Sequence, residues 1–249
     1  GGGGGAAGAG GPARWDKGGS ALAMPLLCCD DVLQCEAEIA AEVAMDLLGN
    51  FLERNEGEPD MHIVVVVEEG SPALSALRSF CNISDPRFVV VTCGLGEEGV
   101  CLSRLKDFGR PCAFLAIESD RFFGKGRRPC RGRSSEVFDA SGPSLSSPPS
   151  SSGGAGLIGT TPPTALGKAT QTRYGKTLGE VGRAYPVPLS SPCPLYVSQG
   201  VETVLHVVCP SMEEGADGYV GTDLARQREV LGRCYHSVCE AFNSLRPRK

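Results

Sequence analysis

The sequence predicts an α/β domain built around a mostly parallel sheet, and three observations support this prediction. Short β-branched runs recur between stretches of helical period, so strands and helices alternate along the chain. The run HIVVVV at 62–67 is almost continuously apolar, as expected for a strand covered on both faces. With 41% hydrophobic and 21% charged residues, the 249-residue chain can bury the core of such a domain.

The helices and strands are predicted in order along the chain. Apolar residues at three-to-four spacing predict a helix from Cys28 to Phe51, with Asp30 or Asp31 as its N-cap. Ser71 followed by Pro72 is typical of a helix start, and this helix should run to about Phe80. The remaining patterns predict strands at 62–67, 87–93, 112–117, 184–189 and 201–208, and helices at 100–108, 166–178 and 223–245.

Low-complexity composition marks the segments that we expect to lie outside this order. Residues 1–27 form a Gly/Ala-rich N-terminus, which is expected to be disordered. The domain then covers 28–245, with a disordered Ser/Pro/Gly insertion at 144–164 and a basic tail at 246–249. No run of 18 apolar residues occurs, so a membrane span is not expected. The net charge of -5 argues against a surface that binds nucleic acid over its whole extent.

Twelve cysteines raise the question of disulfides or a metal site. Their spacing is irregular, no CxxC occurs, and the three histidines lack ligand-like spacing to any cysteine. We therefore expect reduced, intracellular thiols that mostly lie in the core, and no metal. His206 lies within an apolar strand and is expected to be a hydrogen-bonded core histidine.

Two loops contain candidate ligand-binding residues. Gly94–Gly99 reads GLGEEG, a match to the dinucleotide-binding pattern, with Glu118 at the end of the following strand. Glu97 and Glu98 would oppose a bound phosphate, so a NAD-dependent Rossmann-type enzyme is the weakest alternative. The loop 121–133 carries six Arg and Lys residues without an acid, and it is either a solvated loop or a grip for phosphate or nucleic acid.

Several stretches resemble a known family. The strand and turn GVETVLHVVCPSM at 200–212 is similar to the macrodomain strand that leads into His-x-x-Gly-Pro, most of all in plant aprataxin-like proteins. VFDASGPSL at 137–145, AYPVPL at 184–189 and the face of the helix 224–242 follow in the family's order. HIVVVV and NISDPRF at 82–88 resemble the segment that leads into this macrodomain. The resemblance implies a three-layer α/β/α macrodomain with a mixed, mostly parallel sheet.

The resemblance also implies a function, which is recognition of ADP-ribose or a related nucleotide, in the nucleus and in DNA repair. The matching positions make Asp120, Gly132 and Ser134 the candidate ligand-binding residues, with Arg131 and Arg133 beside them. The family's histidine-triad and kinase-like catalytic segments have no counterpart here, so we expect no catalytic residue, no cofactor and no enzyme activity. The alternative is a scaffold that contacts nucleic acid or protein through the basic loop 121–133.

Departures from the family pattern predict a degraded binding site. Where the family has Asn-Ala-Ala-Asn, this chain reads Ile117-Glu118-Ser119-Asp120, and a carboxylate accepts hydrogen bonds without donating them. The family's Gly-rich loop is reduced to the single glycine Gly132 between two arginines. The family order also implies that the C-terminal strand of the sheet and its phosphate loop are missing. Binding of ADP-ribose should therefore be weak.

Overall fold

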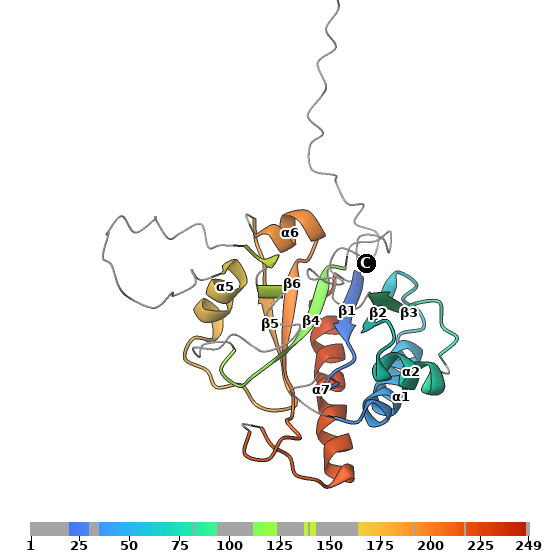
Figure 1. Cartoon of the computed structure of the whole chain (residues 1–249). Coiled ribbons are helices and arrows are strands. Elements are labelled where there is room, and N and C mark those ends of the chain that lie inside the picture. The colour runs from blue at the N-terminus through green and yellow to red at the C-terminus, as the bar shows by residue number, and fades with distance from the viewer. Residues whose placement is uncertain are drawn as a thin grey trace, which may run out of the picture.

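A single six-stranded sheet forms the centre of the molecule, in the order β3-β2-β1-β4-β6-β5 (Figure 1). The computed structural model describes residues 20–29, 35–81, 83–93, 112–123, 137–138, 140–142, 164–191, 193–216 and 218–247. The strands are β1 (Ser20–Pro25), β2 (Met61–Glu68), β3 (Phe88–Cys93), β4 (Phe114–Ser119), β5 (Ala184–Pro188) and β6 (Thr203–Val208). All neighbouring strands pair in parallel except β5, which is antiparallel to β6. The predicted mixed, mostly parallel sheet is confirmed.

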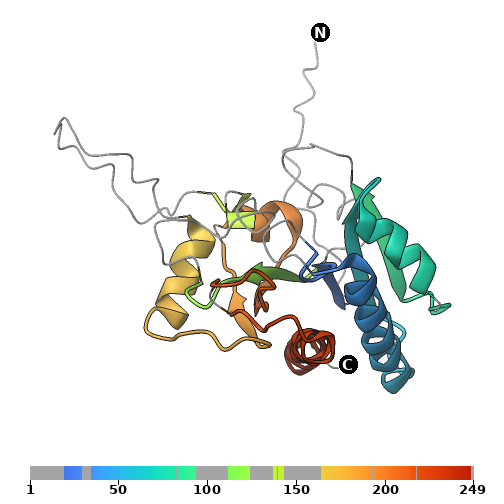
Figure 2. The ribbon, with the colours of Figure 1, turned by 60° about the horizontal axis from the view of Figure 1, so that its bottom comes forward.

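Helices cover both faces of the sheet, which makes the molecule three-layered (Figure 2). One face carries the first, second and last helices, namely α1 (Ala37–Arg54), α2 (Pro72–Phe80) and α7 (Leu224–Leu245). The other face carries α5 (Ala165–Tyr174) and the short α6 (Pro194–Gln199). On β2, alternate valines enter the two separate cores, with Val65 on the α1 side and Val64 on the α5 side. This double burial is why the strand is apolar throughout.

β1 corrects the prediction that residues 1–27 are disordered. Its residues Ser20–Pro25 lie between β2 and β4, where Leu22 pairs with Ile63 on one side and Phe114 on the other. Ala21–Met24 are at most 2% exposed, so a deeply buried strand comes from the segment predicted to be a disordered N-terminus. The prediction failed because alanine and proline are weak strand formers. Residues 1–19 lie outside the described part of the chain.

The other elements lie close to their predicted positions. α2 begins where Ser71-Pro72 indicated, and the Ser71 hydroxyl accepts a hydrogen bond from the Leu74 amide at 3.2 Å. α1 begins at Ala37 rather than Cys28, because Leu26–Cys28 form a turn after β1. Neither Asp30 nor Asp31 is the residue before this helix, which is Glu36.

The predicted basic tail begins with a residue that belongs to the fold. Arg246 is 7% exposed, and its guanidinium donates to the Glu58 carboxylate at 3.0 Å. The predicted helix at 100–108, the basic loop beyond Phe123 and the Ser/Pro/Gly tract at 144–163 lie outside the described residues. Among the helices that the structure describes, none has the length and apolar character needed to cross a membrane.

Candidate functional site at the carboxyl ends of the strands

The strand order identifies one place in the sheet where a ligand site is expected. From β1 the chain moves outward to β2 and β3, and it then returns to the other side of β1 to form β4. Parallel α/β sheets bind ligands outside the carboxyl ends of the strands, at the point where the strand order reverses. In this molecule that switch point lies between the ends of β1 and β4.

Cys28 and Glu118 occupy the switch point. Cys28, two residues past Leu26 in the turn after β1, has a left-handed backbone with φ of 66°. Its amide donates a hydrogen bond to the Glu118 carboxylate at the end of β4. The adjacent Leu27 amide donates to the Tyr235 hydroxyl on α7 at 2.9 Å. The chain turn after β1 is thereby tied to both β4 and α7.

Asp120, the one candidate ligand residue that the structure describes, lies one step beyond β4. Its side chain is exposed, and its Oδ1 accepts a hydrogen bond from the Phe122 amide at 2.8 Å. This contact folds the start of the following loop back on itself. Arg131, Gly132, Arg133 and Ser134 lie outside the described residues, so their predicted roles stay predictions.

The start of the basic loop takes part in the fold. The Arg121 Nε donates to the Gly179 carbonyl at 3.0 Å, and the Gly179 amide donates to the Arg121 carbonyl at 2.7 Å. Arg121 therefore joins the start of the basic loop to the segment around Gly179. Phe123, which follows it with φ of 53°, is buried against Tyr174 and Tyr185.

His206 confirms the prediction of a core histidine. It is 0% exposed, with Nδ1 at 2.7 Å from the Ser119 hydroxyl and Nε2 at 3.0 Å from the Thr170 hydroxyl. Burial lowers its pKa to about 3, so the ring is neutral at physiological pH. Both ring nitrogens already have partners, so His206 positions β4 and α5 rather than a substrate.

Three thiols lie near the switch point, in the core on the α7 face of the sheet. Cys28 follows β1, Cys209 follows β6, and Cys234 lies on α7, and each is at most 5% exposed. Burial raises the pKa of the Cys28 thiol above its ordinary value. Most of the ten cysteines in the described residues are buried, as predicted for core thiols. Sequence analysis did not single these three out, because their separation along the chain carries no local signal.

The dinucleotide interpretation of Gly94–Gly99 does not agree with the sheet. A dinucleotide-binding βαβ unit carries its glycines and its acidic residue on neighbouring strands. Here β3, which precedes Gly94, and β4, which carries Glu118, are separated by β2 and β1. Glu118 also contacts Cys28 rather than a site beside β3. The Rossmann-type interpretation is therefore wrong.

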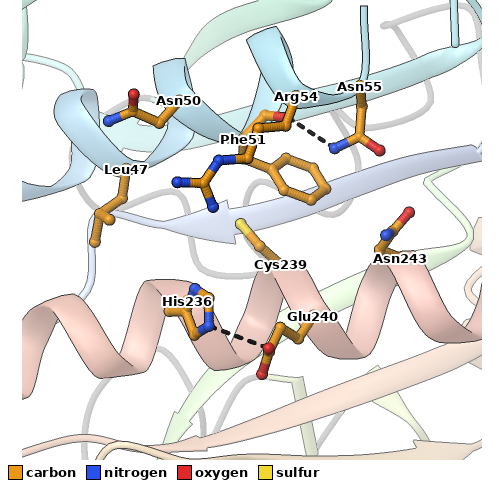
Figure 3. A pocket seen from close by; sticks show the side chains of 9 residues that line it. All are labelled: Leu47, Asn50, Phe51, Arg54, Asn55, His236, Cys239, Glu240 and Asn243. Carbon is orange, nitrogen blue, oxygen red and sulfur yellow. Dashed lines mark hydrogen bonds and ion pairs between the residues drawn. The ribbon is translucent and has the colours of Figure 1, made fainter. Parts of the chain in front are cut away.

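A hollow lies between α1 and α7, away from the carboxyl ends of the strands (Figure 3). It has a volume of about 430 Å³ and is lined by Leu47, Asn50, Phe51, Arg54, Asn55, His236, Cys239, Glu240 and Asn243. Phe242, in the same turns of α7, packs edge-on against Phe114 at the start of β4, with ring centroids 5.0 Å apart. The hollow therefore lies toward the amino ends of the strands. Its polar groups include an exposed His236–Glu240 pair at 3.1 Å, which gives no convergent set of ligand contacts.

Two solved structures share this architecture. One is an Oryza sativa APL macrodomain in complex with ADP-ribose, with a TM-score of 0.71 and 21% identity, covering 92% of this chain and 98% of that chain. The other is a Dictyostelium discoideum ADP-ribose binding macrodomain, with a TM-score of 0.66 and 18% identity, covering 90% of each chain. The chain therefore has the macrodomain fold. The match extends over 98% of the rice macrodomain, and the described sheet has six strands where the sequence predicted five. β1 is the strand that the sequence analysis overlooked.

Sequence comparison adds one curated relative. The chain is 25% identical to the Arabidopsis thaliana protein named transcription factor bHLH140 over 228 residues. This match covers 90% of the present chain. The chain spans only 21% of the length of that relative. No family model matches the chain.

Proposed function

We propose that this chain is a macrodomain-type module that recognises ADP-ribose or a related nucleotide at the carboxyl ends of β1 and β4. The observation that carries the proposal is the switch point itself, where a left-handed turn at Cys28 faces the end of β4. Both macrodomains that share the fold are described as binding ADP-ribose. Asp120 is exposed at this edge, where it can accept hydrogen bonds from ribose hydroxyls.

We further propose that the affinity is low. The Cys28 amide, a donor of the kind that macrodomain-like loops offer to phosphate, already donates to the Glu118 carboxylate. Glu118 and Asp120 also place two carboxylates at the end of β4, where they oppose the approach of a pyrophosphate. A dissociation constant near millimolar corresponds to only about -4 kcal/mol of binding free energy.

The module is proposed to bind without catalysis, and to act within an aprataxin-like DNA-repair protein in the nucleus. The context rests on the sequence resemblance given above. The lack of catalysis rests on His206, the histidine nearest the strand ends in the described core, which is neutral and engaged at both nitrogens. The segment of the Arabidopsis relative outside the match is long enough to hold further domains.

Calorimetric titration of the full chain with ADP-ribose tests this proposal, and Asp120→Asn is the informative variant. Asparagine can still accept the Phe122 amide, but it removes a negative charge and adds two donors. Loss of a like charge near the phosphates is worth roughly 1 kcal/mol, so we expect about fivefold tighter binding. Glu229→Gln, an equal charge change at an exposed position of α7, should leave the affinity unchanged.

Two results would contradict the proposal. Weaker binding by Asp120→Asn would mean that the contact of the carboxylate with ribose outweighs its repulsion of the phosphates, against the proposed cause of the low affinity. Equal, strongly salt-dependent binding of ADP-ribose, NAD and single-stranded DNA would favour the scaffold alternative, in which the basic loop 121–133 binds phosphate without selecting the nucleotide.

A further inference from the structure

A cluster of metal-ligand side chains lies on the α7 side of the switch point. The Cys28 and Cys209 sulfurs and a Glu118 carboxylate oxygen all lie within 4.8 Å of one another. Cys234 adjoins them, because its thiol and that of Cys209 share a hydrogen bond. The Cys234 sulfur is also 3.9 Å from the Val208 carbonyl. Four separate parts of the chain thus contribute one ligand-type side chain each: the turn after β1, strand β4, the residue after β6, and helix α7.

This cluster is not explained by apolar packing alone. Buried free thiols behave as small apolar side chains, and Cys28, Cys209 and Cys234 are 0%, 5% and 0% exposed. A half-buried Glu118 carboxylate beside such sulfurs brings a charged group into a poorly solvated place. A cation held between the sulfurs and the carboxylate would offset that cost and use all four side chains.

We propose that Cys28, Cys209, Cys234 and Glu118 bind one zinc ion. Thiolate ligands favour zinc among the common divalent ions, and four ligands suit its tetrahedral structural sites. Zinc–sulfur bonds of about 2.3 Å place tetrahedral sulfurs roughly 3.8 Å apart, so the Cys28 and Cys209 sulfurs need to approach each other by no more than about 1 Å. On binding, each thiol loses its proton to solvent and the sulfur donates its lone pair to the ion.

The contacts around the cluster suit this role. The Cys28 amide donates to the Glu118 carboxylate, which orients that carboxylate toward the sulfurs as outer partners orient metal ligands elsewhere. The Leu27 amide donates to Tyr235, the neighbour of Cys234 in the chain, so the turn after β1 is already docked on α7. Zinc would therefore link β1, the central strand, to the last helix and stabilise the sheet.

The experiment uses the full chain, purified under reducing conditions and stripped of metal with a chelator. We expect one zinc ion per chain by mass spectrometry after reconstitution, and a sulfur-to-cobalt charge-transfer band with Co²⁺ in its place. Cys28→Ala and Cys209→Ala should each weaken zinc binding by more than about 100-fold, the upper range for loss of an outer partner alone. Cys239→Ala, a buried cysteine of α7 outside the cluster, should keep full zinc binding.

Circular dichroism without metal separates folding from binding, and Glu118→Gln gives a second, milder variant. It keeps an acceptor for the Cys28 amide but removes the anionic ligand, so it should weaken zinc binding while the metal-free protein stays folded. The proposal is overturned if the wild-type chain binds no zinc at stoichiometric concentration. It is equally overturned if folded Cys28→Ala and Cys209→Ala proteins retain the cobalt band, which would place the metal elsewhere.

Discussion

At the scale of single residues, His206 shows how burial decides chemistry. The ring lies between Ser119 and Thr170, and Phe138 packs near it with centroids 5.7 Å apart. In this apolar surround the imidazolium would lose its hydration without gaining a carboxylate partner from these neighbours. Histidine is used here as a neutral bridge between β4 and α5, since it can bond two hydroxyls at once.

The lowered pKa of His206 predicts a pH dependence of stability. The unfolded chain takes up a proton below its ordinary pKa of 6.5, whereas the folded chain does so only near 3. Between these values the unfolded state holds one more proton, so the free energy of unfolding should fall as pH falls, by about 1.4 kcal/mol per pH unit. Urea unfolding at pH 5.5 and pH 4.5, both inside this window, measures this slope.

Two variants separate His206 from the other titrating groups. His206→Gln should be less stable at pH 7, by roughly 1–3 kcal/mol, and its pH slope should be flatter. Ser244→Ala, at an exposed position of α7, removes no titrating group, and its slope should match that of the wild type. If His206→Gln retains the wild-type slope, the dependence arises elsewhere.

At the scale of the elements, α2 illustrates a helix whose start is determined locally. Ser71 caps the Leu74 amide, and its hydroxyl donates to the Glu68 carbonyl at 2.7 Å, which joins the end of β2 to the helix. Pro72 supplies a fixed φ at a position whose amide needs no partner. Each of these interactions joins residues only three positions apart, and sequence analysis therefore located this boundary correctly.

Ser71→Ala should destabilise the chain by about 1 kcal/mol, because the Leu74 amide loses its acceptor. Ser71→Asp, which restores an acceptor, should recover most of the loss. Ser75→Ala, at an exposed position inside the same helix, should be neutral or slightly stabilising since alanine favours helices. Denaturant midpoints of the three variants give the comparison, and equal losses for Ser71→Ala and Ser75→Ala would refute the capping role.

At the scale of the whole molecule, β1 holds the two halves of the sheet together. On one side it pairs with β2 along its full length, and on the other it pairs with β4 through Leu22 and Ala23. Without β1, the pair β2–β3 and the group β4–β6–β5 would share no backbone hydrogen bonds within the described sheet. Two cores on opposite faces would also open, because Leu22 belongs to one and Ala23 to the other.

Two truncations test the role of β1. Removal of residues 1–19 should leave the denaturant midpoint unchanged, because that Gly/Ala-rich segment has little apolar surface to bury. Removal of 1–27 deletes β1, and the product should be unfolded or aggregated, since an apolar sheet would lose its central strand. Circular dichroism and size-exclusion chromatography report the outcome. A folded, monomeric 28–249 fragment would contradict the central role of β1.

The sequence by itself determined those features that depend on neighbouring residues. The β-branched run of β2, the cap and proline of α2, and the apolar face of α7 all act within a few residues, so pattern and propensity were sufficient to place them. The alternation of these elements also established the α/β class. Of the candidate site, only Asp120 was both predicted and described, because its place after an apolar strand is a local feature.

The tertiary structure alone decided which distant residues meet. The short strand SALAMP lacks a strong strand signal, and only its place between β2 and β4 buries Ala21–Met24. Cys28, Glu118 and Cys209 are far apart in the chain, and they come together because parallel strands deliver their carboxyl ends to one edge. Spacing rules find metal sites built from one loop, but a site assembled from four parts of the chain depends on strand order, which no local pattern encodes.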